Sequence, residues 1–184
     1  MDIMLPEGIL RNVRQIVSPN YNDRPLDTAI DLLVIHNISL PPGEFGTSAV
    51  VDFFCNQLET SAHPGYADLV DLKVSAHVFI RRDGEIIQFV PFNKRAWHAG
   101  KSHFAGREGC NDYSIGIELE GTDNLAYTIN QYHQLAAVSN CLMRVYPGIM
   151  PQRIVGHVDI APTRKTDPGQ AFDWSFYRGL LVKE

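Results

Sequence analysis

Two of the seven histidines in this 184-residue chain directly follow short apolar segments, and an aspartate lies downstream of the second one. His36 follows residues 32–35, and His157 follows residues 153–156, with Asp167 ten residues further on. A catalytic zinc site uses three protein ligands of these types and leaves one coordination position open for water. If the two segments are neighbouring strands, the trio could supply that ligand set. No HExxH motif supports a metal site independently, so hydrogen-bonded structural histidines are the alternative interpretation.

One carboxylate and one lysine are the further candidates for catalysis. Side chains alternate strictly along residues 114–120, which predicts a strand with Glu118 and Glu120 on the same face. A carboxylate among apolar neighbours is costly to bury without a partner or a chemical role. Glu118 is therefore a candidate acid or base, and an ion pair across the sheet is the alternative. Lys165 lies in a predicted loop at 159–169, where it could stabilise a developing oxyanion or simply be solvated.

These candidates require a sheet that brings their strands together. The unbroken apolar run at 32–35 is typical of a strand buried on both faces. Residues 76–80 and 85–90 flank an Asp-Gly turn, which predicts a β-hairpin. Together with 114–120 and 153–156, these segments predict a sheet whose strand ends carry the candidate residues.

Three apolar-periodic segments predict helices against this sheet, at residues 49–58, 128–146 and 173–182. The second begins with a capping box formed by Thr128 and Gln131, and Asp173 could cap the third. Residues 1–30 are rich in Pro, Asn and Asp and indicate an extended arm. Interleaved strands and helices, at this length, predict a single α/β (α+β) domain spanning residues 1–184.

Composition and charge narrow the classes of partner. The chain has 16 Lys and Arg against 21 Asp and Glu, and it lacks the basic cluster that nucleic-acid binding needs. No apolar stretch approaches the roughly 18 to 20 residues that span a bilayer, and the N-terminus does not resemble a signal peptide. The three cysteines fit no zinc-finger spacing and indicate free thiols in a reducing compartment. We expect a cytoplasmic protein, by default a monomer, that binds neither nucleic acid nor membrane.

Six ordered motifs between residues 32 and 169 resemble one known family. They are LLVIHNISLPPG at 32–43, SAH and IRRDG within 75–84, AWHAG at 96–100, CND at 110–112, GIELEGTD at 116–123, and GH, DIAP and RKTDPG within 156–169. In this ordered set the chain resembles the AmpD-type 1,6-anhydro-N-acetylmuramyl-L-alanine amidases. The wider group includes phage lysozyme-type amidases and animal peptidoglycan-recognition proteins. The match runs nearly end to end and is more specific than any single motif.

The resemblance implies a central mixed β-sheet flanked by α-helices, with one zinc ion (Zn²⁺) in a groove. The positions that match the family's zinc ligands are His36, His157 and Asp167. Glu118 matches a catalytic glutamate, and Lys165 matches a lysine that stabilises the transition state. His77 also matches a position near the site, but three ligands suffice, so we expect it outside the ligand set.

The resemblance also implies a substrate. The reaction is hydrolysis of the amide between the lactyl group of 1,6-anhydro-N-acetylmuramic acid and the L-alanine of a muropeptide stem. The implied role is cytoplasmic recycling of cell-wall fragments, which indirectly limits β-lactamase induction where that system exists. Asn37, Trp97 and His98 lie in motifs expected near the groove and are candidate contacts to the substrate. Core packing of Trp97 and loop turning at Asn37 are the alternatives.

Two positions depart from the family pattern. Lys73 stands where an arginine is common, and Gly109 stands where a basic residue often precedes the Cys-Asn-Asp motif. Lysine cannot reproduce the bidentate fork of arginine, so we expect the hold on substrate carboxylates to differ.

Two alternative functions follow from the same resemblance. One is a non-catalytic peptidoglycan-binding module, and the complete set of three matched ligand positions argues against it. The other is an amidase that acts on polymeric cell wall, and the absence of a signal peptide argues against that substrate.

Overall fold

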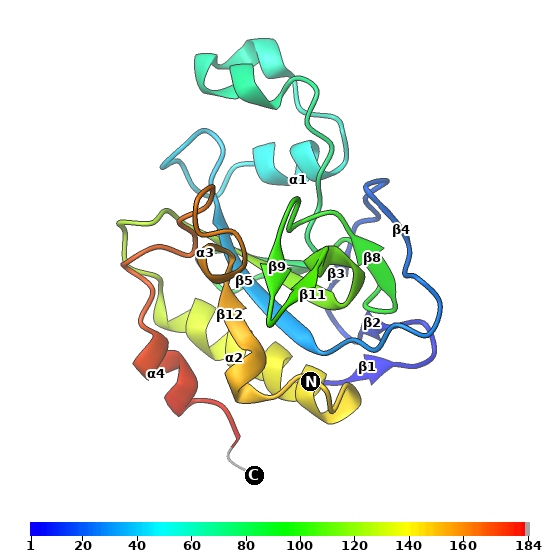
Figure 1. Cartoon of the computed structure of the whole chain (residues 1–184). Coiled ribbons are helices and arrows are strands. Elements are labelled where there is room, and N and C mark those ends of the chain that lie inside the picture. The colour runs from blue at the N-terminus through cyan, green and yellow to red at the C-terminus, as the bar shows by residue number, and fades with distance from the viewer. Residues whose placement is uncertain (183–184) are drawn as a thin grey trace.

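A six-stranded mixed sheet forms the centre of the computed structural model, which describes residues 1–182 (Figure 1). Its strand order is β12 (Ile154–Gly156), β5 (Leu32–Ile38), β11 (Ser114–Glu120), β6 (Val78–Ile80), β7 (Ile86–Gln88) and β3 (Arg14–Gln15). The first four are parallel, β7 is antiparallel to β6, and β3 is parallel to β7. The predicted hairpin is confirmed as β6 and β7, with shorter strands than the sequence suggested.

The parallel register aligns the ends of three strands. His36 on β5 and Glu118 on β11 are partners in the ladder. Gly156 on β12 pairs with Ile35, so His157 follows at the level of His36. Because the carboxyl ends of parallel strands lie at one edge of a sheet, the register brings all three candidate residues to that edge.

Helices cover both faces of the sheet. α2 (Ile129–Val145) and α4 (Trp174–Gly179) share an apolar core with Ile115, Ile117 and Leu119 of β11. On the opposite face, α1 (Ala49–Phe54) contributes to an apolar cluster with β6 and β7, and α3 (His157–Ile160) to one with β5 and β12. This arrangement confirms the predicted mixed sheet flanked by helices.

The helix boundaries agree only in part with the sequence patterns. α2 begins after Thr128, and both hydrogen bonds of the capping box with Gln131 are present, at 3.0 and 3.2 Å. α1 stops short of the predicted residue 58, since Asn56 adopts the left-handed φ of +57°. α4 is capped by Asp173 as predicted but ends at Gly179 rather than residue 182.

Residues 1–30 are more ordered than the predicted extended arm. They contain β1 (Ile3–Met4), β2 (Ile9–Leu10), β3 and β4 (Tyr21–Asp23); β1 pairs with β2, and β4 pairs with β8 (Lys94–Ala96). The buried side chain of Gln88 accepts a hydrogen bond from Leu10 N at 2.7 Å and donates one to Gly8 O at 3.0 Å. Strands this short leave no periodic pattern, so these contacts were not predictable from local sequence.

The remaining elements lie in connections. They are β9 (His103–Phe104), β10 (Arg107–Glu108) and the 3-10 helices Thr60–Ala62, Pro64–Leu69, Cys110–Asp112 and Pro151–Arg153. α3 differs from the sequence prediction as well, because its helical turn extends into the predicted loop at 159–169. The Asp159 carboxylate accepts a hydrogen bond from Gly156 N at 2.7 Å and so caps this turn. Within residues 1–182, no helix combines the length and apolar character that crossing a membrane requires.

Candidate active site

Three ligand-type side chains converge at the carboxyl end of the sheet. His36 lies in β5, His157 begins α3 directly after β12, and Asp167 comes from the following loop. The Nδ1 atoms of His36 and His157 are 2.9 Å apart, and Asp167 Oδ2 lies 3.0 Å from the first and 3.1 Å from the second. β5 and β12 are neighbours, which is the condition that the sequence left open.

The geometry of this group fits a metal ion. Ligand atoms around a tetrahedral zinc ion, with bonds of roughly 2.0–2.1 Å, lie about 3.3 Å from one another. The three separations here, 2.9–3.1 Å, are slightly shorter than this distance. The three atoms lie close enough together to hold one metal ion. Two imidazole lone pairs directed at one carboxylate oxygen repel unless a proton or a cation lies between them. A divalent cation removes that repulsion.

The surroundings of His36 and Asp167 favour the protonation states that metal binding requires. Burial lowers the pKa of His36 to about 4, and the neighbouring His157 acts in the same direction. Burial alone would raise the pKa of Asp167, but hydrogen bonds with His157 and His36 hold that pKa below its usual range. At neutral pH the site therefore offers a neutral imidazole at His36 and a charged carboxylate, the forms that coordinate metals.

Glu118 lies beside this group on the neighbouring strand. It lines a cavity of about 230 Å³ together with Lys165 and Trp97. Burial raises the pKa of Glu118 well above its usual range, the charge of Asp167 raises it further, and Lys165 opposes both. The Oε2 atom of Glu118 is buried without a hydrogen-bond partner among residues 1–182. This environment suits an acid or base more than a member of a cross-sheet ion pair.

Glu120, on the same face of β11, has a structural role instead. Its Oε1 accepts a hydrogen bond from Gly46 N at 2.6 Å, and its Oε2 accepts one from Arg82 N at 3.0 Å. The carboxylate thus ties a surface loop and the hairpin turn to the sheet. Of the two carboxylates predicted on this face, only Glu118 borders the cavity described above.

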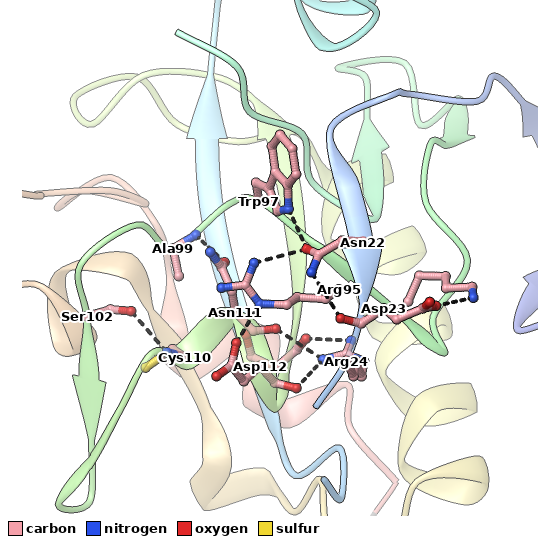
Figure 2. A network of polar contacts seen from close by, with 12 residues as sticks. Asn22, Asp23, Arg24, Arg95, Trp97, Ala99, Ser102, Cys110, Asn111 and Asp112 are labelled. Carbon is pink, nitrogen blue, oxygen red and sulfur yellow. Dashed lines mark hydrogen bonds and ion pairs between the residues drawn. The ribbon is translucent and has the colours of Figure 1, made fainter. Parts of the chain in front are cut away.

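Asn37 and Trp97 form walls near the ligand group. Asn37 borders two cavities that also share Lys165, and its Nδ2 donates to Asp123 Oδ1 at 2.8 Å. Trp97 is half-buried, and its indole N–H donates to Asn22 Oδ1 at 2.7 Å (Figure 2). A half-buried indole at a cavity wall does not support the alternative of core packing for Trp97.

His98 lines the same cavity as Glu118 and Trp97, and its ring is hydrogen-bonded on both sides within the protein. Its Nδ1 lies 2.9 Å from His36 Nε2, and its Nε2 lies 3.1 Å from Ser114 Oγ. The ring covers Gly116 so closely that a Cβ there would lie 2.4 Å from it. Both ring nitrogens are therefore engaged within the protein, and contact of the His98 side chain with substrate stays a prediction.

His77 lies outside the ligand group, as expected. Its Nδ1 accepts a hydrogen bond from Gly116 N at 3.0 Å, and its Nε2 lies 3.0 Å from Lys94 O. Burial lowers its pKa to about 3, and the charge of Arg24 contributes. The ring is therefore a neutral structural group at neutral pH.

Arg24 and Asn111 are two residues near the site to which the sequence assigned no role. Arg24 donates to the backbone carbonyls of residues 92, 111, 112 and 114, and burial lowers its pKa to about 10. Figure 2 shows Asn111 turned toward the backbone of Ala99. The Cys-Asn-Asp motif drew attention to Asn111 in the sequence. The residues that Asn111 contacts lie elsewhere in the chain, so the motif did not identify them.

The two departures from the family pattern lie on the surface. Lys73 is exposed. Gly109 adopts a φ of +68°, in the left-handed region that favours glycine, and borders a separate cavity of about 500 Å³.

The N-acetylmuramoyl-L-alanine amidase family matches residues 26–170. The chain belongs to this family. The amidase is 57% identical over 182 residues to the 1,6-anhydro-N-acetylmuramyl-L-alanine amidase AmpD of Escherichia coli (strain K12), with 99% of each chain covered. It is 52% identical over 173 residues to AmpD of Haemophilus influenzae, with 94% of each chain covered.

Solved structures show the same fold as this amidase. The crystal structure of a Se-Met AmpD derivative has a TM-score of 0.94 at 57% identity, covering 98% of this chain and 100% of that one. AmiD of E. coli, solved with the substrate anhydro-N-acetylmuramic acid-L-Ala-D-gamma-Glu-L-Lys, has a TM-score of 0.60 at 29% identity, covering 86% and 62%. The family resemblance seen in the sequence is thus confirmed, and the protein is a hydrolase of amide bonds.

Proposed function

We propose that the protein hydrolyses the amide that joins the lactyl group of 1,6-anhydro-N-acetylmuramic acid to the L-alanine of a stem peptide. The observation that carries this proposal is the position of Glu118, which pairs in register with His36 and borders one cavity together with His157 and Asp167. The names of the AmpD relatives support the substrate, as does the ligand bound to AmiD. This reaction fits cytoplasmic recycling of muropeptides, with an indirect effect on β-lactamase induction.

One zinc ion, held by His36, His157 and Asp167, is part of the proposal. The separations of 2.9–3.1 Å between their ligand atoms support it. When bound, the ion supplies Lewis acidity, which makes water a stronger acid and polarises the scissile carbonyl. The three side chains would offer two imidazole nitrogens and one carboxylate oxygen, which are donor types found at catalytic zinc sites.

Glu118 is the proposed general base and acid. A buried carboxylate with a raised pKa is suited to exchange a proton near neutral pH. It takes one proton from the attacking water and delivers it to the alanine nitrogen as the C–N bond breaks. The new C–O bond leaves a carboxylic acid on the sugar side and a free amine on the peptide. No covalent bond to the protein is needed.

Lys165 is proposed to stabilise the oxyanion that develops on the scissile carbonyl. Its side chain lines the cavity that Glu118 borders, and its positive charge acts on Glu118. Asn37 and Trp97, in the walls, are proposed to contact the substrate. The amide of Asn37 suits a peptide group, and the indole of Trp97 offers an apolar face to sugar or peptide.

Mass spectrometry of an anhydro-N-acetylmuramyl tripeptide incubated with the purified protein tests this function. We expect release of free tripeptide, loss of that release with a chelator, and recovery when zinc is restored. An intact substrate in the presence of zinc-loaded protein contradicts the proposal.

The same assay separates the two alternatives. A binding module retains the substrate unchanged, so hydrolysis that disappears in Asp167→Ala eliminates it. Comparable turnover of intact sacculi and of the soluble tripeptide would instead favour an amidase of polymeric wall.

A further inference from the structure

One two-residue segment holds the outer nitrogens of both candidate histidine ligands. His36 Nε2 lies 2.9 Å from His98 Nδ1, and His157 Nε2 lies 3.3 Å from the Ala99 carbonyl oxygen. A histidine that binds a metal typically engages its second nitrogen in such a contact. The contact fixes the ring orientation and determines which nitrogen carries the proton.

The Ala99 carbonyl selects the tautomer of His157. A carbonyl oxygen can only accept a hydrogen bond, so the proton resides on Nε2 of His157. The Nδ1 atom then presents its lone pair. Nδ1 is the atom that lies 3.1 Å from Asp167 Oδ2, inside the ligand group.

The contact that supports His36 is made by the imidazole ring of His98. Ser114 Oγ lies 3.1 Å from His98 Nε2, and a hydroxyl oxygen can accept a hydrogen bond there. In the tautomer with the proton on Nε2, His98 presents Nδ1 as an acceptor. His36 then donates from Nε2, and its Nδ1 presents the lone pair. Both histidines are thereby set to coordinate through the same ring atom.

Asn111 holds this segment in place. Its Oδ1 accepts a hydrogen bond from the backbone N–H of His98 at 3.1 Å. It accepts a second one from the backbone N–H of Ala99 at 2.8 Å (Figure 2). Asn111 is 7% exposed, and Arg24 donates to its backbone carbonyl at 3.2 Å. A single side-chain oxygen therefore positions the supports of both ligands.

Gly116 provides the space that the His98 ring occupies. A Cβ on Gly116 would lie 2.4 Å from Cγ and Nδ1 of that ring, well inside contact distance. Gly116 lies inside β11, where a left-handed backbone is not required. Close approach of His98 therefore explains a glycine at this position.

We propose that His98 and Ala99, held by Asn111, form a positioning unit that makes Nδ1 the metal-binding atom of both His36 and His157. The inference rests on the proposed metal site and extends it to residues that contact its ligands. It gives His98 a positioning role in addition to the predicted contact with substrate.

Zinc affinity, measured by competition with a chromophoric chelator, tests this unit. His98→Ala should weaken zinc binding about 10- to 100-fold, the usual cost of losing a group that supports a ligand. Asn111→Ala should also weaken it, whereas Asn111→Asp keeps the accepting oxygen and should restore binding. His133→Ala, on an exposed position of α2, is the matched control and should bind zinc as the wild type does.

A double-variant cycle tests the contact between Gly116 and His98 directly. Gly116→Ala alone should weaken zinc binding, because the added methyl group displaces the ring. In the Gly116→Ala/His98→Ala protein the methyl group fits the vacated space, so binding should be no weaker than in His98→Ala. Losses that simply add would contradict the proposed contact.

Nitrogen NMR of the zinc-loaded protein provides the second readout. We expect Nδ1 coordination and a protonated Nε2 in both His36 and His157 of the wild type, with altered His36 signals in His98→Ala. Circular dichroism of the metal-free variants separates these effects from misfolding. If the wild type binds no zinc, the proposed function fails. If the wild type binds zinc and His98→Ala and Asn111→Ala match it in affinity and coordination, only the positioning unit is refuted.

Discussion

Glu118 and His36 are register partners on the parallel strands β11 and β5, so their side chains leave the same face of the sheet side by side. The pairing of Gly156 with Ile35 places His157 next to them. Strands therefore position Glu118 and His36, His157 begins α3 directly after β12, and Asp167 comes from a loop. Such support holds reacting groups at defined separations.

Replacing Glu118 with glutamine removes the base and keeps the size of the side chain. We expect kcat to fall by about 10²- to 10⁴-fold, the usual contribution of a positioned acid or base. The zinc content should not change. Steady-state kinetics and metal analysis of the same preparation check both statements. Loss of zinc from Glu118→Gln would instead assign Glu118 to the ligand set.

Removing a candidate ligand should release the metal. We expect His157→Ala and Asp167→Ala to lose zinc on dialysis, because two remaining ligands bind it weakly. Asp173→Ala is a matched control, since this carboxylate caps a different helix, α4, and is not in the ligand group. Metal analysis after dialysis distinguishes the three proteins, and zinc retained in all of them would refute the ligand assignment.

The raised pKa of Glu118 predicts a pH-dependent stability of the metal-free protein. The folded state binds this proton more tightly than the unfolded state, where the ordinary glutamate pKa applies. The free energy of unfolding therefore falls as pH rises from the unfolded pKa through the folded pKa.

Glu118→Gln has no ionisable group at position 118. Comparing it with the wild type therefore isolates the effect of this one proton on the free energy of unfolding. The variant should be more stable than the wild type at about pH 8, and the difference should shrink toward about pH 4. All other titratable groups are present in both proteins, so the comparison reports the change at position 118. Urea unfolding of chelator-treated protein across this range checks the sign, and a difference independent of pH would contradict it.

The hydrogen bond between Asn22 and Trp97 predicts an effect on substrate binding. Asn22→Ala leaves the indole N–H without its 2.7 Å partner and frees the ring to change orientation. We expect KM to rise about 2- to 10-fold with little change in kcat, as for loss of one hydrogen bond. Asn93→Ala, whose amide donates instead to Pro6 O, is the control. An unchanged KM would show that Trp97 does not contact the substrate.

Local patterns predicted the elements that carry the candidate site. The alternation at 114–120 became β11, and the run at 32–35 became the buried part of β5. The capping box at Thr128 marked the start of α2. Each of these signals comes from residues that are close together in the chain. Hydrophobic periodicity and helix capping depend only on such local sequence.

The features that the sequence patterns did not predict depend mainly on contacts between residues far apart in the chain. His98 meets His36 across 62 positions, and no local pattern records such a contact. Gln88 holds Leu10 across 78 positions, which orders a segment that composition described as an extended arm. The early end of α1 depends on one backbone conformation, at Asn56, that several residue types can adopt.

The three ligand-type atoms come from remote parts of the chain, with His36 lying 121 positions from His157 and 131 from Asp167. An unfolded chain does not gather them, so a metal ion at the proposed site would bind the folded form almost alone and would stabilise it by mass action. The midpoint of thermal unfolding should therefore rise with the concentration of free zinc. Metal supply would then govern how much of the chain is folded at a given temperature as well as how fast the folded form works.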